Sequence, residues 1–199
     1  DRLLFTFSTD NGLVFDREVS FLDTDLLQTL EPRLFYRYTP YRNQQELPIF
    51  DTAKYDISFG QLFRENNFTG ADRVDDGHQI TLALTSRLLG SATGMEHLRT
   101  SVGQTYYLRD RQVTLPGQPT ESDSYSPLIV EMAAQPVTHW TNAATLIWDP
   151  GTGHTQQTVL RTRYRPDDER VVNLSYRLRK QTLEQTDVSW HWPLGVHWK

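Results

Sequence analysis

Three consecutive segments between residues 154 and 193 alternate polar and apolar residues with a period of two. Side chains point alternately to the two sides of a strand, so this period predicts three β-strands with one polar and one apolar face each. We expect these strands at 155–165, 170–180 and 184–193. The polar rows are rich in arginine, and a slip of one residue would turn a whole row to the wrong side.

The register follows from keeping both rows on their own sides. It places these residues opposite each other: Arg163 and Asn173, Arg161 and Ser175, Arg177 and Asp187, Arg179 and Gln185, Tyr176 and Val188, and Leu174 and Trp190. The apolar pairs among them are favourable cross-strand contacts, worth about 0.2–1 kcal/mol each.

Alternation continues in the earlier part of the chain. We expect a hairpin of 2–8 and 13–22 around Asp10-Asn11-Gly12, because Asn-Gly pairs favour tight turns. A strand at 26–39 contains Pro32, which lacks a backbone donor and predicts a bulge or an edge there. Further strands are expected at 78–89, 96–109, 125–136 and 139–148, giving about ten or eleven strands.

Two long loops interrupt the pattern. The first, 40–77, is rich in large apolar residues, so we expect it to be ordered, with a short strand or helix near 57–64. The second is 111–124. After the opening hairpin, short connections alternate with longer ones, which is typical of a membrane-spanning meander with two unlike ends.

Composition narrows the class of fold. The chain has 199 residues, 37% of them hydrophobic, and its mean hydropathy is -0.58. No apolar run approaches the roughly 18 residues of a transmembrane helix, but alternating strands of a barrel average to such values. Tryptophan and tyrosine stand at strand ends, as in interfacial girdles: Tyr36, Tyr38, Trp140, Trp148, Trp190, Trp192 and Trp198.

We therefore predict an all-β antiparallel meander that forms part of a large transmembrane outer-membrane β-barrel. Residues 1–199 would be a fragment of a single barrel domain, since the chain opens on an apolar run and ends as if starting another strand. The alternative is a soluble, carbohydrate-binding β-sandwich with the aromatic residues in its core. A third hypothesis is that the protein is a passive porin.

Little in the sequence indicates catalysis. There is no cysteine, and the six histidines are scattered without the spacing of metal ligands. We expect the adjacent carboxylates Asp75-Asp76 and Asp167-Asp168 to lie solvated in turns. A net charge of -5 gives no argument for nucleic acid. The sequence predicts no enzyme, no metal site and no cofactor.

The polar face is the better candidate for function. In a barrel it lines the lumen, where arginine can bind phosphates, carboxylates or a plugging protein. The candidate binding residues are Arg33, Arg37, Arg87, Arg161, Arg163, Arg177 and Asp187. The alternative is that these groups only solvate the interior and neutralise one another.

Several sequence motifs are more specific than the alternation of polar and apolar residues. They are Leu30-Glu-Pro-Arg-Leu-Phe-Tyr-Arg-Tyr-Thr-Pro-Tyr-Arg-Asn-Gln, Leu47-Pro-Ile-Phe-Asp-Thr, Leu62-Phe-Arg-Glu-Asn-Asn-Phe-Thr-Gly-Ala-Asp-Arg-Val, Gln79-Ile-Thr-Leu-Ala-Leu-Thr-Ser-Arg, Ser101-Val-Gly-Gln-Thr-Tyr-Tyr-Leu, Val172-Asn-Leu-Ser-Tyr-Arg and Glu184-Gln-Thr-Asp-Val-Ser-Trp-His-Trp-Pro-Leu. In this order they resemble the LptD family of outer-membrane LPS-assembly proteins.

The resemblance implies a central part of the barrel that delivers lipopolysaccharide to the outer leaflet of a Gram-negative outer membrane. Its implied partners are the lipoprotein plug LptE, lipopolysaccharide, membrane lipid and the LptA bridge, which docks on an N-terminal domain absent here. The gate strands and disulfide cysteines are absent too. Loop 40–77 would fold towards the plug, with candidate contacts at Tyr41, Phe63, Arg64, Asp72 and Arg73.

Overall fold

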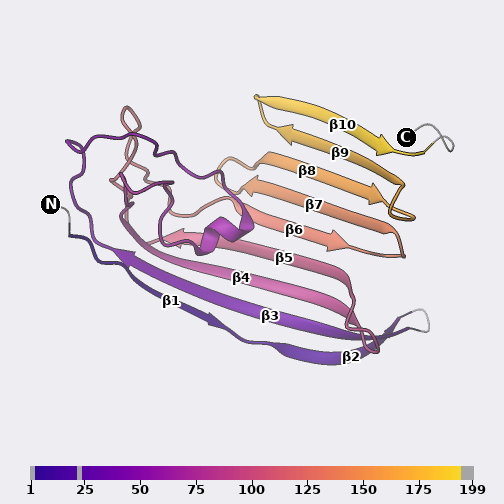
Figure 1. The fold of residues 1–199 in the computed structure, drawn as a ribbon. Coiled ribbons are helices and arrows are strands. Elements are labelled where there is room, and N and C mark those ends of the chain that lie inside the picture. The colour runs from indigo at the N-terminus through magenta and orange to yellow at the C-terminus, as the bar shows by residue number, and fades with distance from the viewer. Residues whose placement is uncertain (1–2, 22–23, 194–199) are drawn as a thin grey trace. The chain divides into compact units, whose positions relative to one another are not determined.

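The computed structural model of this protein describes residues 3–21 and 24–193, which form one ten-stranded sheet (Figure 1). The strands follow the order β1-β3-β4-β5-β6-β7-β8-β9-β10, and β2 also pairs with β3. The elements are β1 (Phe7–Gly12), β2 (Phe15–Phe21), β3 (Thr24–Thr39), the 3-10 helix η1 (Phe59–Phe63), β4 (Gly77–Gly90), β5 (Glu96–Tyr107), β6 (Leu128–Ala134), β7 (Trp140–Asp149), β8 (His154–Tyr164), β9 (Val171–Arg179) and β10 (Leu183–His191). The expected all-β antiparallel meander is confirmed.

The chain divides into two compact units, which we describe separately. Unit 1 comprises residues 1–13, 32–83 and 103–127, and unit 2 comprises residues 14–31, 84–102 and 128–199. Unit 1 contains both long connections, 40–76 and 108–127, together with η1. The strands from β6 to β10 belong to unit 2. The expected strand opening at 196–199, with Trp198, lies outside the described residues.

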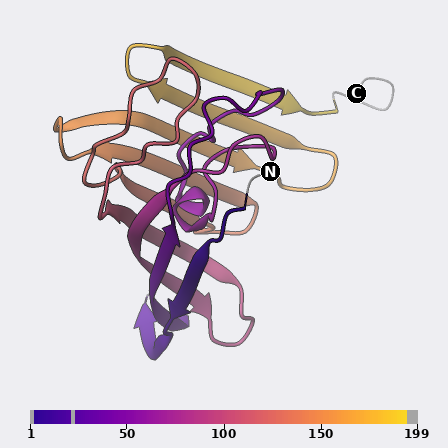
Figure 2. The same ribbon diagram turned by 90° about the vertical axis from the view of Figure 1, so that its left-hand side faces the viewer.

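The long connection 40–76 is ordered and has its own apolar core, as expected. Leu62 and Phe68 are buried. Within it, η1 is held by 3-10 bonds, in which the Gln61 N–H donates to the Ser58 carbonyl at 3.1 Å. Figures 1 and 2 show this helix lying against the sheet. A Cβ added to Gly103 of β5 would stand 3.0 Å from Leu62 Cδ1, so the missing side chain allows this close packing.

The expected opening hairpin is wrong. β1 and β2 both pair with β3, so Asn11 lies opposite Leu34 and Phe15 lies opposite Leu30. Gly12 is not among the glycines with positive φ, which a tight hairpin turn would require. The break between β1 and β2 falls beside Pro32, whose carbonyl accepts from the Leu13 N–H at 3.0 Å. The pairs on both sides of Pro32 keep the same register, with Gly12 opposite Arg33 and Phe15 opposite Leu30, and β3 has neighbours on both sides. The bulge or edge predicted at Pro32 is therefore not found, and the partner strand is interrupted there instead.

The register of β8 with β9 is confirmed, since Arg163 pairs with Asn173 and Arg161 with Ser175. The register of β9 with β10 is wrong by two residues, because the observed pairs include Arg177 with Gln185, Ser175 with Asp187, Leu174 with Val188 and Val172 with Trp190. The cause is a tighter turn than expected. Gln181 adopts a φ of 60°, and the Thr182 N–H donates to the Arg179 carbonyl at 3.1 Å.

The alternation of short and long connections holds only in the first half of the sheet. Segments 40–76 and 108–127 are long and 91–95 is short. From β6 onwards the connections 135–139, 150–153, 165–170 and 180–182 are all short, and the two expected to be longer are not.

The apolar rows are exposed in each unit. In unit 1, Leu82 is 46% exposed, and in unit 2 the values are 44% for Leu174 and 70% for Trp190. A β-sandwich would bury these three side chains beneath a second sheet, so the sandwich expectation is wrong. Trp140 and Trp148 are exposed at the two ends of β7, as the girdle interpretation requires. No helix among the described residues is long and apolar enough to cross a membrane.

Candidate functional site

The polar face of unit 1 is covered by its two long connections, and Arg37 of β3 lies beneath them. Its side chain is completely buried, and its guanidinium donates to both carboxylate oxygens of Asp75, at 2.8 and 2.9 Å. It also donates to the Glu65 carbonyl at 2.6 Å and to Gln79 at 3.2 Å. Such a bidentate pair fixes direction as well as charge, so Arg37 anchors the connection 40–76 to the strand.

Gly77 makes this anchor possible. A Cβ on that residue would stand 2.2 Å from Nη2 of Arg37, closer than any real contact allows. The first residue of β4 therefore has to be glycine for the guanidinium to pass. The carboxylate of Asp75 is further fixed by the side-chain amide of Asn67, which donates to it at 2.7 Å.

Asp76 anchors the second long connection, 108–127, in a similar way. One of its oxygens accepts from the backbone N–H groups of Gln112 and Val113, at 2.9 and 2.8 Å. The other lies 3.4 Å from Arg109, which also donates to the Thr39 carbonyl at 2.6 Å. The expectation that Asp75 and Asp76 are solvated is wrong, since both are buried. The two adjacent carboxylates lie against different arginines, and these positive charges offset the repulsion between them.

A third ionic contact links the two connections directly. Glu121 forms ion pairs with Lys54 and with Arg111, the latter at 3.2 Å. Arg111 also lies over the ring of Tyr107, 3.5 Å from its centroid. Burial acts to raise the pKa of Glu121, but the hydrogen bonds and charges of Lys54 and Arg111 outweigh it and hold this pKa below its ordinary value.

The five expected plug-contacting residues divide by exposure. Phe63 packs against Phe35 and Arg33 of β3, and its ring centroid lies 3.7 Å from the Arg33 guanidinium carbon. Asp72 accepts from the Phe50 N–H at 2.9 Å, a bond that lowers its pKa against the opposing effect of burial. Two of the five are exposed and one is fully enclosed: Tyr41 and Arg64 are exposed, and Arg73 is buried.

Two of the expected lumenal arginines are neutralised by neighbouring strands. Arg33 pairs with Asp10 of β1, at 2.8 Å from Nε. Arg87 of β4 pairs with Glu31 of β3 and Glu96 of β5, at 3.1 and 3.2 Å. For these side chains, the interpretation that lumenal charges compensate one another is the one that fits.

The remaining arginines form a different kind of surface on β8 and β9 of unit 2. We call Arg161, Arg163 and Arg177 the arginine patch; all three are exposed on the polar face. Among the described residues none of them takes part in an ion pair, and Arg163 donates only to Asn173, at 2.8 Å. The expected pairing of Arg177 with Asp187 is absent, because the shifted register directs Asp187 to Ser175 and Gln185. The patch therefore presents uncompensated positive charge.

Sequence alternation predicted correctly that the arginines share the polar face. It did not predict that Asp75, Asp76 and Glu121 anchor the long connections. Their role depends on where two long connections meet, which local alternation does not encode. One signal was available, because an arginine on a face covered by an apolar loop needs a carboxylate within reach. Across the described part of the chain, no group of histidine and carboxylate side chains is arranged to hold a metal ion.

Comparison with known proteins extends this picture. The model of the family described as LptD, LPS transport system D, matches residues 1–198. An LPS-assembly protein LptD from Nitrosococcus oceani is 44% identical over 197 residues, which cover 99% of this chain and 27% of that protein. The corresponding protein of Thiobacillus denitrificans is 43% identical with the same coverage. That of Xanthomonas oryzae is 40% identical over 96% of this chain and 25% of its own length. The chain thus spans about a quarter of these relatives.

Proposed function

Because this chain belongs to the LptD family, we propose that it forms part of the wall of an outer-membrane β-barrel that assembles lipopolysaccharide in the outer leaflet of a Gram-negative cell. Residues 1–199 would be one piece of a single barrel domain. The family is one of transport proteins and not of enzymes. Passage of the lipid needs no bond-making residue in this piece, only a path.

The observation that carries the proposal is the two-sided character of the sheet. Large apolar side chains are exposed along one face, as on Leu160 and Leu174 of unit 2, and exposed apolar surface of this extent marks contact with a membrane or a partner. The opposite face of the same strands bears the arginine patch. Uncompensated guanidinium groups favour phosphate and carboxylate, which fits an anionic glycolipid passing along that face.

We further propose that a lipoprotein plug of the LptE type contacts the connection 40–76. Tyr41 and Arg64 are exposed and available for that contact. Phe63 and Asp72 would act indirectly, because their side chains hold the connection in place, and Arg73 is buried. Delivery from the periplasm by an LptA-type bridge would use a domain outside this sequence.

Charge reversal in the arginine patch tests the proposal. The double variant Arg161→Glu and Arg163→Glu, in the full-length protein, should lower the amount of lipopolysaccharide at the cell surface, because both groups would repel an anionic lipid. The matched control reverses Arg165 and Arg170, which lie in the β8–β9 turn and pair with Asp168 and Asp167. Unchanged surface lipopolysaccharide in the patch variant, at normal barrel abundance, would refute the role of the patch.

A passive pore is the second candidate, since a polar lumen also conducts ions. The LptD family match favours the assembly role. Conductance of the purified barrel with its plug in place separates the two functions: a porin conducts ions steadily, and a plugged assembly barrel does not.

A further inference from the structure

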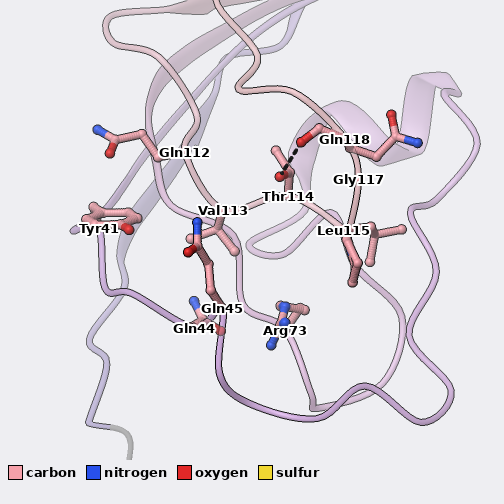
Figure 3. Close-up of a pocket in the computed structure, with 11 residues that line it drawn as sticks. Tyr41, Gln44, Gln45, Arg73, Gln112, Val113, Thr114, Leu115, Gly117 and Gln118 are labelled. Carbon is pink, nitrogen blue, oxygen red and sulfur yellow. Dashed lines mark hydrogen bonds between the residues drawn. The ribbon is translucent and has the colours of Figure 1, made fainter.

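The two long connections of unit 1 line a pocket between them (Figure 3). It has a volume of about 300 Å³ and is lined by Tyr41, Gln44, Gln45, Arg73 and residues 112–118. Small-molecule sites in proteins occupy roughly 300–1,000 Å³. The pocket is therefore large enough for a small ligand of about one sugar ring and its substituents.

Arg73 gives the pocket its charge. The residue is only 3% exposed, and Figure 3 shows its guanidinium at one end of the pocket, below Val113 and Thr114 in that view. The one hydrogen bond that its side chain makes within the described chain is a long contact of 3.5 Å to the Asp72 carbonyl. None of the ion pairs among the described residues involves it, and the neighbouring Asp75 and Asp76 already face Arg37 and Arg109.

A buried guanidinium without a counter-charge is costly, because desolvation is not repaid by an ion pair. No carboxylate lines the pocket, so the chain itself does not supply the missing anion there. The site consequently favours an anionic group from outside the chain.

The other lining groups indicate what else the ligand carries. Gln45 and Gln118 contribute side-chain amides that have no hydrogen-bond partner within the described chain, and Thr114 contributes a hydroxyl whose proton is donated to the Gln118 carbonyl at 3.0 Å. Amides donate and accept, which suits several hydroxyl groups on one ring. A lone carboxylate from a protein side chain would satisfy only Arg73.

We propose that this pocket binds a small anionic saccharide, with its phosphate or carboxylate on Arg73 and its hydroxyls on Gln45 and Gln118. The proposal rests on the proposed function only for the source of the ligand, which would be an acidic sugar of the transported glycolipid. The pocket chemistry can be tested without transport.

The test uses the full-length barrel with its plug, purified in detergent, and saturation-transfer difference NMR with glucose 6-phosphate as the probe. We expect a binding signal for glucose 6-phosphate and a weaker one for uncharged glucose. Arg73→Gln should weaken binding of the phosphorylated sugar by about tenfold, the loss of a charge-assisted hydrogen bond. Arg42→Gln is the matched control, because Arg42 is exposed on the same connection outside the pocket.

Gln118→Ala provides a second variant, since this exposed side chain can be shortened without opening the core. This variant should weaken the binding of glucose 6-phosphate severalfold. It should retain the heat-modifiable gel mobility of a folded barrel. Unchanged affinity in folded Arg73→Gln would overturn the proposal, as would equal affinity for inorganic phosphate or a signal seen only after the plug is removed. Failure of binding beside normal lipopolysaccharide export would refute the pocket and leave the proposed function intact.

Discussion

At the scale of single residues, the buried pairs of unit 1 decide where the long connections go. Arg37 and Asp75 are both buried, and each is the other's bidentate partner. Replacing such a pair by apolar residues can be neutral, whereas removing one member leaves a buried charge alone. The anchor is therefore sensitive to single changes in a way that surface ion pairs are not.

Asp75→Asn should release the connection 40–76 from β3. The change leaves the Arg37 charge buried without a carboxylate, which typically costs about 3–5 kcal/mol. We expect faster cleavage within 40–76 by limited proteolysis of the folded full-length protein, since local opening exposes the chain. Glu46→Gln, an exposed change in the same connection, should cleave at the wild-type rate. Equal rates for the two variants would count against the anchor.

Gly77→Ala should act through the same anchor without altering any charge. The new Cβ would collide with a guanidinium that Asp75 and the Glu65 carbonyl hold in place, and overpacking of this kind costs about 1–3 kcal/mol. Gly60→Ala is the matched control, because a Cβ there meets nothing within 4 Å. Thermal unfolding of both variants measures the difference. A midpoint for Gly77→Ala no lower than for Gly60→Ala would exclude the collision.

The sequence predicts half of this site. Alternation along β3 places Arg37 on the polar face, and the apolar composition of 40–77 predicts that something covers that face. The partner remained hidden because adjacent carboxylates such as Asp75 and Asp76 are usually solvated in turns. Their separation onto Arg37 and Arg109 depends on the tertiary path of two loops, and no local period records it.

At the scale of elements, Glu121 joins the two long connections through Lys54 and Arg111. A carboxylate whose pKa is lowered by folding stabilises the protein above its ordinary pKa, and this stabilisation disappears as the pH falls through the lowered value. Glu121→Gln should therefore lower the unfolding midpoint at pH 7. Its difference from wild type should shrink once the pH falls below 4.5, the ordinary value for this side chain. A difference that persists undiminished at pH 3 would contradict this assignment, and Glu46→Gln serves as the control at each pH.

Strand positions could be predicted more securely than strand partners. Alternation located every strand from β3 to β10 to within a few residues, because one face is apolar throughout. It could not fix the register of β9 with β10, since a shift of two residues keeps both faces intact. The hairpin expected at Asp10-Asn11-Gly12 failed for another reason: Pro32 of β3 interrupts its partner strand, and the break resembles a turn in sequence.

At the scale of the whole molecule, the sheet has two faces that require different surroundings. In each unit, apolar side chains are exposed on one face. The polar face of unit 1 carries the buried anchors, and the polar face of unit 2 carries the arginine patch. In the proposed barrel the first face contacts lipid and the second lines the lumen. Two neighbouring residues of β9 therefore face different environments, one towards lipid and the other towards the lumen.

Leu174→Arg and Ser175→Arg test this difference directly. Leu174 is exposed on the apolar face and Ser175 lies on the polar face, so the same side chain is introduced one residue apart. Arginine on a lipid-facing strand costs about 2–4 kcal/mol at mid-membrane, whereas a lumenal arginine remains hydrated. We expect Leu174→Arg to lower the folding yield of the full-length barrel in lipid vesicles, measured by heat-modifiable gel mobility, and Ser175→Arg to fold as wild type. The reverse order would mean that the polar face, and not the apolar one, contacts the membrane.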